Sequence, residues 1–121
     1  MLICIDHPET REIPYCSTYR AMAGLAAESG PGTHDMQCLP LFSLLLALGN
    51  PTVNYLSLDI EGAEYPVLQT IPWDKVDIEV LTVETNHAGE VFTGSRQEIR
   101  DYMVVQGYVL AYSIQGKLFL F

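Results

Sequence analysis

The sequence predicts an α/β layer fold with a mostly parallel sheet and one antiparallel hairpin at its C-terminal end. Apolar runs of the kind found in buried strands alternate with helix signals between residues 36 and 107. Such alternation is typical of crossover connections, which join parallel strands. A Gln115-Gly116 pair between two apolar segments is typical of a hairpin turn, which joins antiparallel strands. The length of 121 residues suits a single domain.

The first third of the chain carries weaker signals. Residues 12–19 predict a strand, which Pro14 confines to a sheet edge or a bulge. Residues 21–34 are small and rich in glycine, so we expect a long loop with at most one helical turn. A short strand over 36–39 then leads into a helix over 41–48. This helix is apolar almost all round and is therefore predicted to be buried.

Two apolar runs, residues 52–60 and 77–85, are the strongest strand signals. Both predict buried strands, and the first is predicted to be central in the sheet and covered on both faces. Residues 63–71 between them predict a helix. Pro66 fits this helix because a residue of the first turn has no intrahelical partner for its N–H.

Capping and turn residues mark the last elements. Ser95 and Glu98 form a capping box that begins a helix, and Gly107 ends it. Residues 108–114 and 117–121 predict the two strands of the closing hairpin.

The chain is strongly acidic. It has 6 Lys and Arg against 15 Asp and Glu, which gives a net charge of −9. This argues against a nucleic-acid binder, which needs a basic patch, and against docking on anionic membranes. A cationic partner fits the charge, although solubility alone also accounts for an acidic surface.

The three cysteines, Cys4, Cys16 and Cys38, form neither a disulfide framework nor a zinc-binding pattern. We expect buried thiols in a reducing compartment. The N-terminus lacks the basic flank of a signal peptide. The longest apolar stretch, residues 39–48, is shorter than the roughly 20 residues that a membrane span needs. This chain by itself is therefore expected to be cytoplasmic.

Polar side chains follow the two strongest predicted strands at the point where each ends. Ligands of open α/β sheets bind outside the carboxyl ends of the strands. Carboxylates at this edge can bind a hydroxyl or an amine, ligate a hard cation, or act as a general base. The first group is Asp59, Glu61 and Glu64, with Gly62 permitting a sharp turn, and the second is Glu84, Asn86 and His87.

Each candidate also has a structural interpretation. Acidic residues at a strand-to-helix turn, here Asp59, Glu61 and Glu64, often act as caps or helix-dipole partners. His87 also fits a solvated imidazole in a loop. A metal site built from Asp59, Glu61, Glu84 and His87 lacks a known ligand spacing, and no metal is predicted.

The stretch VNYLSLDIEGAEYPVLQTIPWDKVDIEVLTVETNH resembles the central motif of the FkbM-type methyltransferases. In that family a strand ends in D-x-E-G-x-E, a helix carrying V-L follows, and the next strand ends in an acidic residue. The upstream QCLPLFSLLLALG, the segment 106–108 and the closing hairpin also match. The segments TIPWDKVDIEVLTVE and NHAGE are most similar in sequence to a Star-like animal branch of this family. The matching motif positions are Asp59, Glu61, Gly62, Glu64, Val67, Leu68 and Glu84.

The resemblance implies a partial class I, Rossmann-like methyltransferase fold, with residues 37–121 as the matched core and 1–36 as a poorly matched segment. It implies S-adenosylmethionine as cofactor and a hydroxyl of a small molecule or glycan as substrate. The resemblance makes Asp59, Glu61 and Glu84 catalytic: Asp59 would orient or deprotonate the hydroxyl, and the two glutamates would shape the substrate side. Substrate contacts would come from Glu64, Asn86 and His87.

The glycine-rich cofactor loop of the family has no counterpart after any predicted strand. We therefore expect a truncated domain, the C-terminal half only, that is inactive by itself and whose cofactor-binding residues are unassigned. The alternative is a non-enzymatic Star-like module that binds protein cargo in endoplasmic reticulum–Golgi–endosome trafficking, membrane-associated if an upstream anchor exists. A third alternative is a nonfunctional remnant. An exposed sheet edge predicts self-association.

Overall fold

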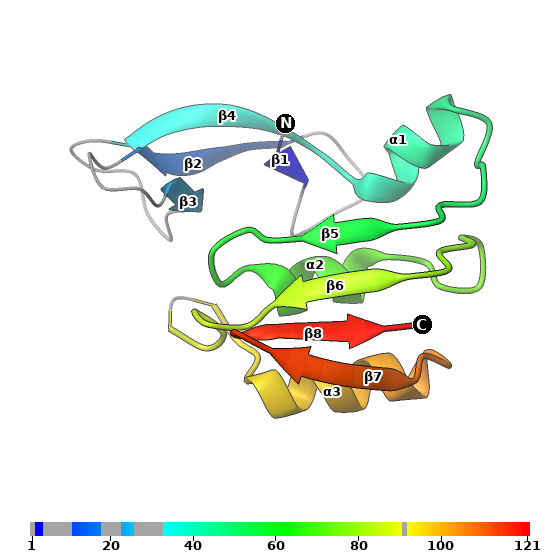
Figure 1. Cartoon of the computed structure of the whole chain (residues 1–121). Helices are drawn as coiled ribbons and strands as arrows, with labels where there is room; N and C mark the ends of the chain where they lie inside the picture. Colours follow the sequence, from blue (N-terminus) through cyan, green and yellow to red (C-terminus); the bar gives the residue numbers. More distant parts are fainter. Residues whose placement is uncertain (1, 4–10, 18–22, 26–32, 91) are drawn as a thin grey trace.

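The computed structural model describes the backbone of residues 2–3, 11–17, 23–25, 33–90 and 92–121, and the side chains of residues 39–90 and 92–121. These residues form two four-stranded sheets and three helices (Figure 1). Cys4 lies outside the described residues, and so do the side chains of Cys16 and Cys38, where buried thiols were expected.

The first sheet has the strand order β1-β4-β2-β3. β2 pairs antiparallel with β4 on one side and with β3 on the other, and β1 pairs parallel with β4. The bounds are β1 (Leu2–Ile3), β2 (Arg11–Ser17), β3 (Ala23–Leu25) and β4 (Thr33–Leu39).

The strands predicted in this region are confirmed as β2 and as the last part of β4. Pro14 pairs with Asp35 of β4, whereas the pairing with β3 begins only at Tyr15. β2 lies between β4 and β3 in the described order, so it is not the edge strand that Pro14 predicted.

The prediction of a long loop over residues 21–34 is wrong in part. Residues 23–25 form β3, and residues 33–34 already belong to β4. Residues 26–32 lie outside the described residues. Small residues have low strand propensity, but pairing with a neighbouring strand overrides so weak a preference.

The second sheet has the strand order β5-β6-β8-β7. β5 and β6 are parallel, as predicted, while β8 is antiparallel to both β6 and β7. The prediction of a mostly parallel sheet with one antiparallel strand is therefore confirmed in part: β5, β6 and β7 run in the same direction and only β8 is reversed, but the strand pairing is mixed. The reason is that the second hairpin strand lies between β6 and β7. The bounds are β5 (Leu56–Leu58), β6 (Leu81–Glu84), β7 (Leu110–Ile114) and β8 (Lys117–Leu120).

The strand predicted over 52–60 is shorter than expected and is not central. β5 lies at one end of the described order, and an isolated bridge from Val53 to Ile78 continues its pairing with the segment before β6. Only Leu58 of its three residues is buried, so it is not covered on both faces. The buried strand predicted over 77–85 is confirmed in part: β6 is buried at every residue, but it begins only at Leu81.

The helix predicted over 41–48 is α1 (Leu41–Ala47), but the prediction that it is buried is wrong. Leu41 and Leu45, one turn apart on one face, are buried. Leu46 is 53% exposed and Leu48 is 74% exposed, because no described residue covers the other face. In the described part of the chain, the helices are all too short or too polar to cross a membrane.

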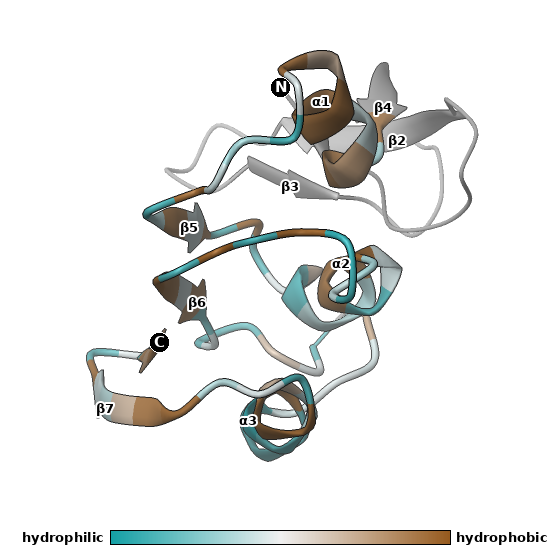
Figure 2. Ribbon diagram, turned by 90° about the vertical axis from the view of Figure 1, so that its right-hand side faces the viewer, coloured by the Kyte–Doolittle hydropathy of each residue, from teal (hydrophilic) through white to brown (hydrophobic). Residues whose placement is uncertain are grey.

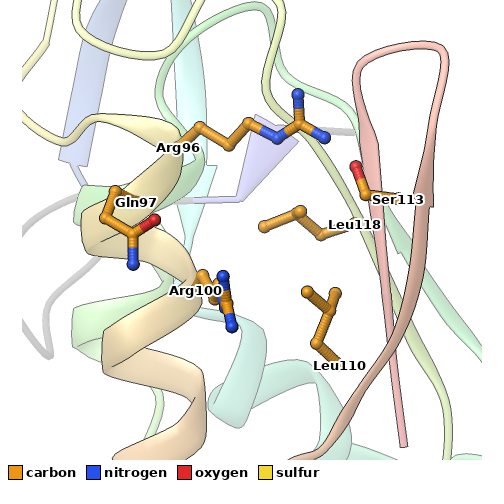
Figure 3. Close-up of a pocket in the computed structure, with 6 residues that line it drawn as sticks. All are labelled: Arg96, Gln97, Arg100, Leu110, Ser113 and Leu118. Atoms are coloured by element: carbon orange, nitrogen blue, oxygen red, sulfur yellow. The ribbon is translucent and has the colours of Figure 1, made fainter.

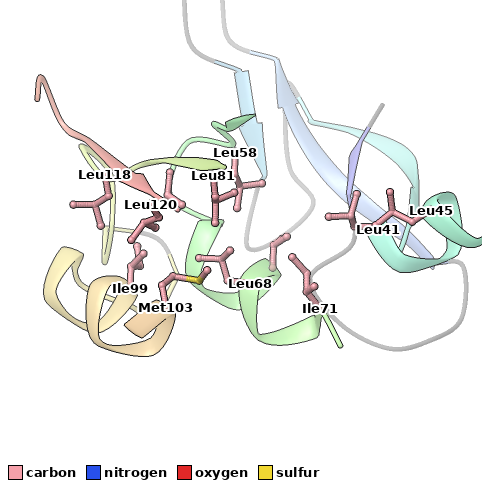
Figure 4. Close-up of a cluster of buried hydrophobic side chains, with 12 residues drawn as sticks. Leu41, Leu45, Leu58, Leu68, Ile71, Leu81, Ile99, Met103, Leu118 and Leu120 are labelled. Atoms are coloured by element: carbon pink, nitrogen blue, oxygen red, sulfur yellow. The ribbon is translucent and has the colours of Figure 1, made fainter. Parts of the chain in front are cut away.

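Two further helices, α2 (Glu64–Thr70) and α3 (Arg96–Val105), cover one face of the second sheet (Figure 2). Pro66 lies in the first turn of α2, as predicted. The helices meet through Tyr65 and Tyr102, whose rings pack edge to face with centroids 5.8 Å apart. The core lies between these helices and the sheet, and Figure 4 shows Leu68 of α2 and Met103 of α3 among its side chains.

The capping and turn predictions are confirmed. Ser95 and Glu98 form the capping box of α3 through both of its hydrogen bonds. Gly107, just after the helix, has a φ of +99°. Gln115 and Gly116 have φ values of +46° and +75°, as the two central residues of a type I′ hairpin turn require.

The other face of the second sheet carries exposed aromatic residues. Side chains alternate between faces along a strand, so this face receives the residues that do not point toward the helices. Tyr55, Tyr112 and Phe121 are each more than half exposed, and the Tyr112 ring stacks on Phe119 with centroids 4.6 Å apart. No helix among the described residues covers this face (Figure 2).

Candidate active site at the carboxyl ends of β5 and β6

The two predicted groups of polar residues come together because β5 and β6 are parallel neighbours. Their carboxyl ends lie at the same edge of the sheet, with Asp59 just after β5 and Glu84 as the last residue of β6. β8 runs in the opposite direction, so it begins at this edge. Its first residue, Lys117, lies directly opposite Glu84. The edge therefore combines two carboxylates and one ammonium group.

Asp59 and Lys117 form an ion pair, with Nζ of the lysine 2.9 Å from Oδ2 of the aspartate. Both side chains are about two-fifths exposed. The Asp59 carboxylate raises the pKa of Lys117 through its hydrogen bond and its charge, and Glu84 adds a smaller effect. The lysine therefore stays charged at neutral pH and occupies one of the two Asp59 oxygens.

Glu84 is 96% buried, with one carboxylate oxygen partnered and the other not. Its Oε1 accepts a hydrogen bond from the backbone N–H of Asn86. Its Oε2 has no partner and is the one buried side-chain oxygen or nitrogen without a hydrogen bond among the described residues. Leaving a buried acceptor without a donor costs about 1–3 kcal/mol, and more for a charged group. Glu84 is therefore the carboxylate of this edge whose hydrogen-bonding capacity the described residues leave partly unused.

The turn after β5 has a strained backbone. Glu61 has a φ of +57°, which is uncommon for a residue with a side chain, and Gly62 follows with +103°. The predicted role of Gly62 is confirmed, because a Cβ there would lie 2.8 Å from the carbonyl oxygen of His87. The turn is thus packed directly against the loop that follows β6.

Glu64 lies beneath this turn and is fully buried. Its Oε1 accepts from the Ile60 N–H at 2.8 Å, and its Oε2 accepts from the Gly62 N–H at 3.0 Å. Burial raises the pKa of Glu64, the Glu84 charge also raises it, and the backbone donors oppose this. Both oxygens are thus occupied within the protein, so the side chain holds the shape of the turn.

His87 lies between two glutamates at the rim of the site. Its Nδ1 is 3.1 Å from Oε2 of Glu90, and its Nε2 is 3.5 Å from Oε2 of Glu61. The hydrogen bond to Glu90 raises the pKa of His87, and the charges of Glu90 and Glu61 act in the same direction against partial burial. The ring connects the turn after β5 to the loop after β6.

The structure brings the predicted site residues to one edge, and it adds two that sequence reasoning missed. Lys117 was missed although the predicted hairpin placed it just after a turn. The sequence did not show that Lys117 pairs with Glu84 in the sheet. Glu90, the partner of His87, gave no signal in the sequence. Asn86 is exposed, and its side chain lies over Gly116 of the hairpin. Within the described ranges, no three His, Cys, Asp or Glu side chains are grouped to hold a metal ion.

A family model described as "Methyltransferase FkbM domain" matches residues 9–110, which is most of the chain. The matched range contains every predicted site residue and begins well before the motif-bearing segment that starts at residue 37. No curated protein and no solved structure matches the chain.

Proposed function

Since the chain belongs to the FkbM methyltransferase domain family, we propose that it forms the substrate-binding part of an S-adenosylmethionine-dependent O-methyltransferase. The proposed substrate is a hydroxyl group of a small molecule or a glycan. The observation that supports this most is the unpartnered Oε2 of the buried Glu84, at the edge of the sheet where α/β folds bind ligands.

The roles of the residues follow from their contacts. Glu84 accepts a hydrogen bond from the substrate hydroxyl at Oε2 and takes its proton as the oxygen becomes nucleophilic. Asp59, fixed at Oδ2 by Lys117, orients the substrate through Oδ1. Glu61 and His87 border the substrate, and Glu64 acts as a positioning residue that maintains the turn.

The cofactor would supply the methyl group, but the two glycines at the candidate site leave no room for it. Gly62 and Gly116 have the positive φ values of a tight loop, yet the space beside each is filled by the chain itself. A side chain at Gly62 would meet the carbonyl of His87, and one at Gly116 would meet Asn86. We propose that the described residues are the C-terminal, substrate-side half of a partial class I, Rossmann-like fold, and no step here is assigned to the cofactor.

The alternative is a Star-like binding module with a protein cargo in endoplasmic reticulum–Golgi–endosome trafficking, placed at a membrane by another segment. The open face of the second sheet favours it, because exposed aromatic residues such as Tyr55, Tyr112 and Phe121 are typical of protein interfaces. The end position of β5 supports a second proposal, self-association through its outer edge. Sedimentation of the purified chain at increasing concentration measures this association.

Two titrations test the main proposal. In the first, methyl glucoside and methyl mannoside are added at millimolar concentration to isotope-labelled chain, and amide NMR shifts are followed. We expect shifts at residues 84–87 and at Asp59, which Glu84→Gln abolishes and the distant Glu79→Gln leaves unchanged. The absence of any shift at this edge would contradict a hydroxyl-binding role.

In the second, S-adenosylhomocysteine is titrated into the chain by calorimetry. A well-folded chain that does not bind in the micromolar range supports an incomplete cofactor site. Micromolar binding would overturn that part of the proposal, and the enzyme would then be complete in this chain.

A further inference from the structure

A cavity of about 370 Å³ lies between α3 and the C-terminal hairpin, on the helix-covered side of the second sheet. The described residues that line it are Arg96, Gln97, Arg100, Leu110, Ser113 and Leu118 (Figure 3). Its volume is within the range of small-ligand sites. It is distinct from the candidate active site, because Lys117 and Leu118 are adjacent in β8 and point to opposite faces of the sheet.

The cavity is cationic in a chain whose net charge is −9. Two of the 6 lysines and arginines line it, and no carboxylate does among the described residues. No ion pair to Arg96 or Arg100 is formed within the described part of the chain. The nearby Asp101 carboxylate accepts instead from the Gln97 side chain.

The placement of the two arginines is unfavourable for α3 by itself. They are four residues apart, so their positive charges lie on neighbouring turns of one helix face and repel each other. Arg96 is also the first residue of the helix, where the dipole disfavours a cation. A bound anion between them would remove both costs.

The remaining lining residues indicate the rest of the ligand. Figure 3 shows Arg96 extending toward Ser113 across the opening, with Leu118 and Leu110 below and Arg100 facing the same space. A guanidinium binds carboxylate and phosphate oxygens through two parallel hydrogen bonds. The hydroxyl of Ser113 adds a donor, and the two leucines supply an apolar wall.

We propose that this cavity binds a small amphiphilic anion, with a phosphate monoester or carboxylate head between Arg96 and Arg100 and an apolar group against Leu110 and Leu118. The site is independent of the proposed methyltransferase function. It requires only the fold of α3 and the hairpin.

The experiment titrates hexyl phosphate, hexanoate and inorganic phosphate into the chain, with calorimetry for affinity and amide NMR shifts for location. We expect saturable binding of hexyl phosphate, with the largest shifts at Arg96, Arg100 and Ser113. Inorganic phosphate is expected to bind roughly tenfold or more weakly, because it lacks the apolar group. The comparison of hexyl phosphate with hexanoate identifies the preferred head group.

The matched variants are Arg100→Gln and Lys75→Gln, which remove the same charge inside and outside the cavity. Arg100→Gln should weaken hexyl phosphate binding by about tenfold to a hundredfold, the range for a lost charged hydrogen bond. Lys75→Gln should leave it unchanged. Equal effects of the two variants, or equal binding of inorganic and hexyl phosphate, would overturn the proposal. The proposal would also be overturned if hexyl phosphate shifted amide signals of the unmodified chain only outside the cavity. This result does not depend on whether a variant folds.

Discussion

The buried Glu64 carboxylate is predicted to be a main support of the turn at the candidate site. It accepts hydrogen bonds from the backbone of Ile60 at 2.8 Å and of Gly62 at 3.0 Å. Hydrogen bonds to a charged group contribute about 1.5–3 kcal/mol each, so the pair contributes about 3–6 kcal/mol. The cost of burying the charge, which also raises its pKa, offsets part of this. We therefore expect Glu64→Ala to lower the free energy of unfolding by about 2–4 kcal/mol.

Urea unfolding followed by circular dichroism measures this loss, with an unchanged m-value as the sign that only stability has changed. The control is Glu79→Ala, which removes an exposed carboxylate bonded to the Asn54 side chain and should leave the midpoint nearly unchanged. A loss below about 1 kcal/mol for Glu64→Ala would refute the reasoning, because two buried N–H groups would then have lost their acceptor at almost no cost.

The same carboxylate gives a pH dependence whose sign follows from burial. The pKa of Glu64 is raised above its ordinary value of 4.5, so the folded state binds the proton more tightly than the unfolded state does. The stability that comes from this tighter proton binding is complete below pH 4.5 and is lost as the pH rises through the folded-state pKa. Relative to Glu64→Gln, the unmodified chain should therefore lose stability between pH 4.5 and neutral pH. A difference that stays constant with pH would contradict this sign.

Three other predictions follow from single contacts. Gly62→Ala should destabilise the fold more than Gly107→Ala. Both glycines have φ near +100°, but only a Cβ at Gly62 would lie 2.8 Å from another backbone atom. Equal urea midpoints of the two variants would disprove the clash. Glu90→Gln should lower the pKa of His87, because the hydrogen bond between Glu90 and His87 is the largest cause of the raised pKa. An NMR titration of the imidazole that shows no change in pKa would rule this out. Ser95→Ala should cost about 1 kcal/mol by removing the side-chain cap of α3, and thermal unfolding measures it.

Local chemistry made much of the C-terminal part predictable. The capping box, the glycine after α3 and the Gln115-Gly116 turn all act within a few residues, so the sequence alone determined these features. The strand ends that carry Asp59 and Glu84 were predictable for a similar reason, because each apolar run stops at an acidic residue, although Glu84 itself is buried.

Tertiary structure decided the features that depend on which segments become neighbours. The insertion of β8 between β6 and β7 makes the sheet mixed and brings Lys117 to Asp59, a contact between residues far apart in the chain. Tertiary structure also decided which side chains are buried. The leucines of α1 suggest a wholly buried helix, but Leu46 is 53% exposed, while the charged Glu64 is buried because two backbone donors compensate it. Sequence patterns thus determined the helices, turns and strand ends, whose hydrogen bonds are local. Only the fold decided sheet order, exposure and the pairing of charges, because these depend on contacts between distant residues.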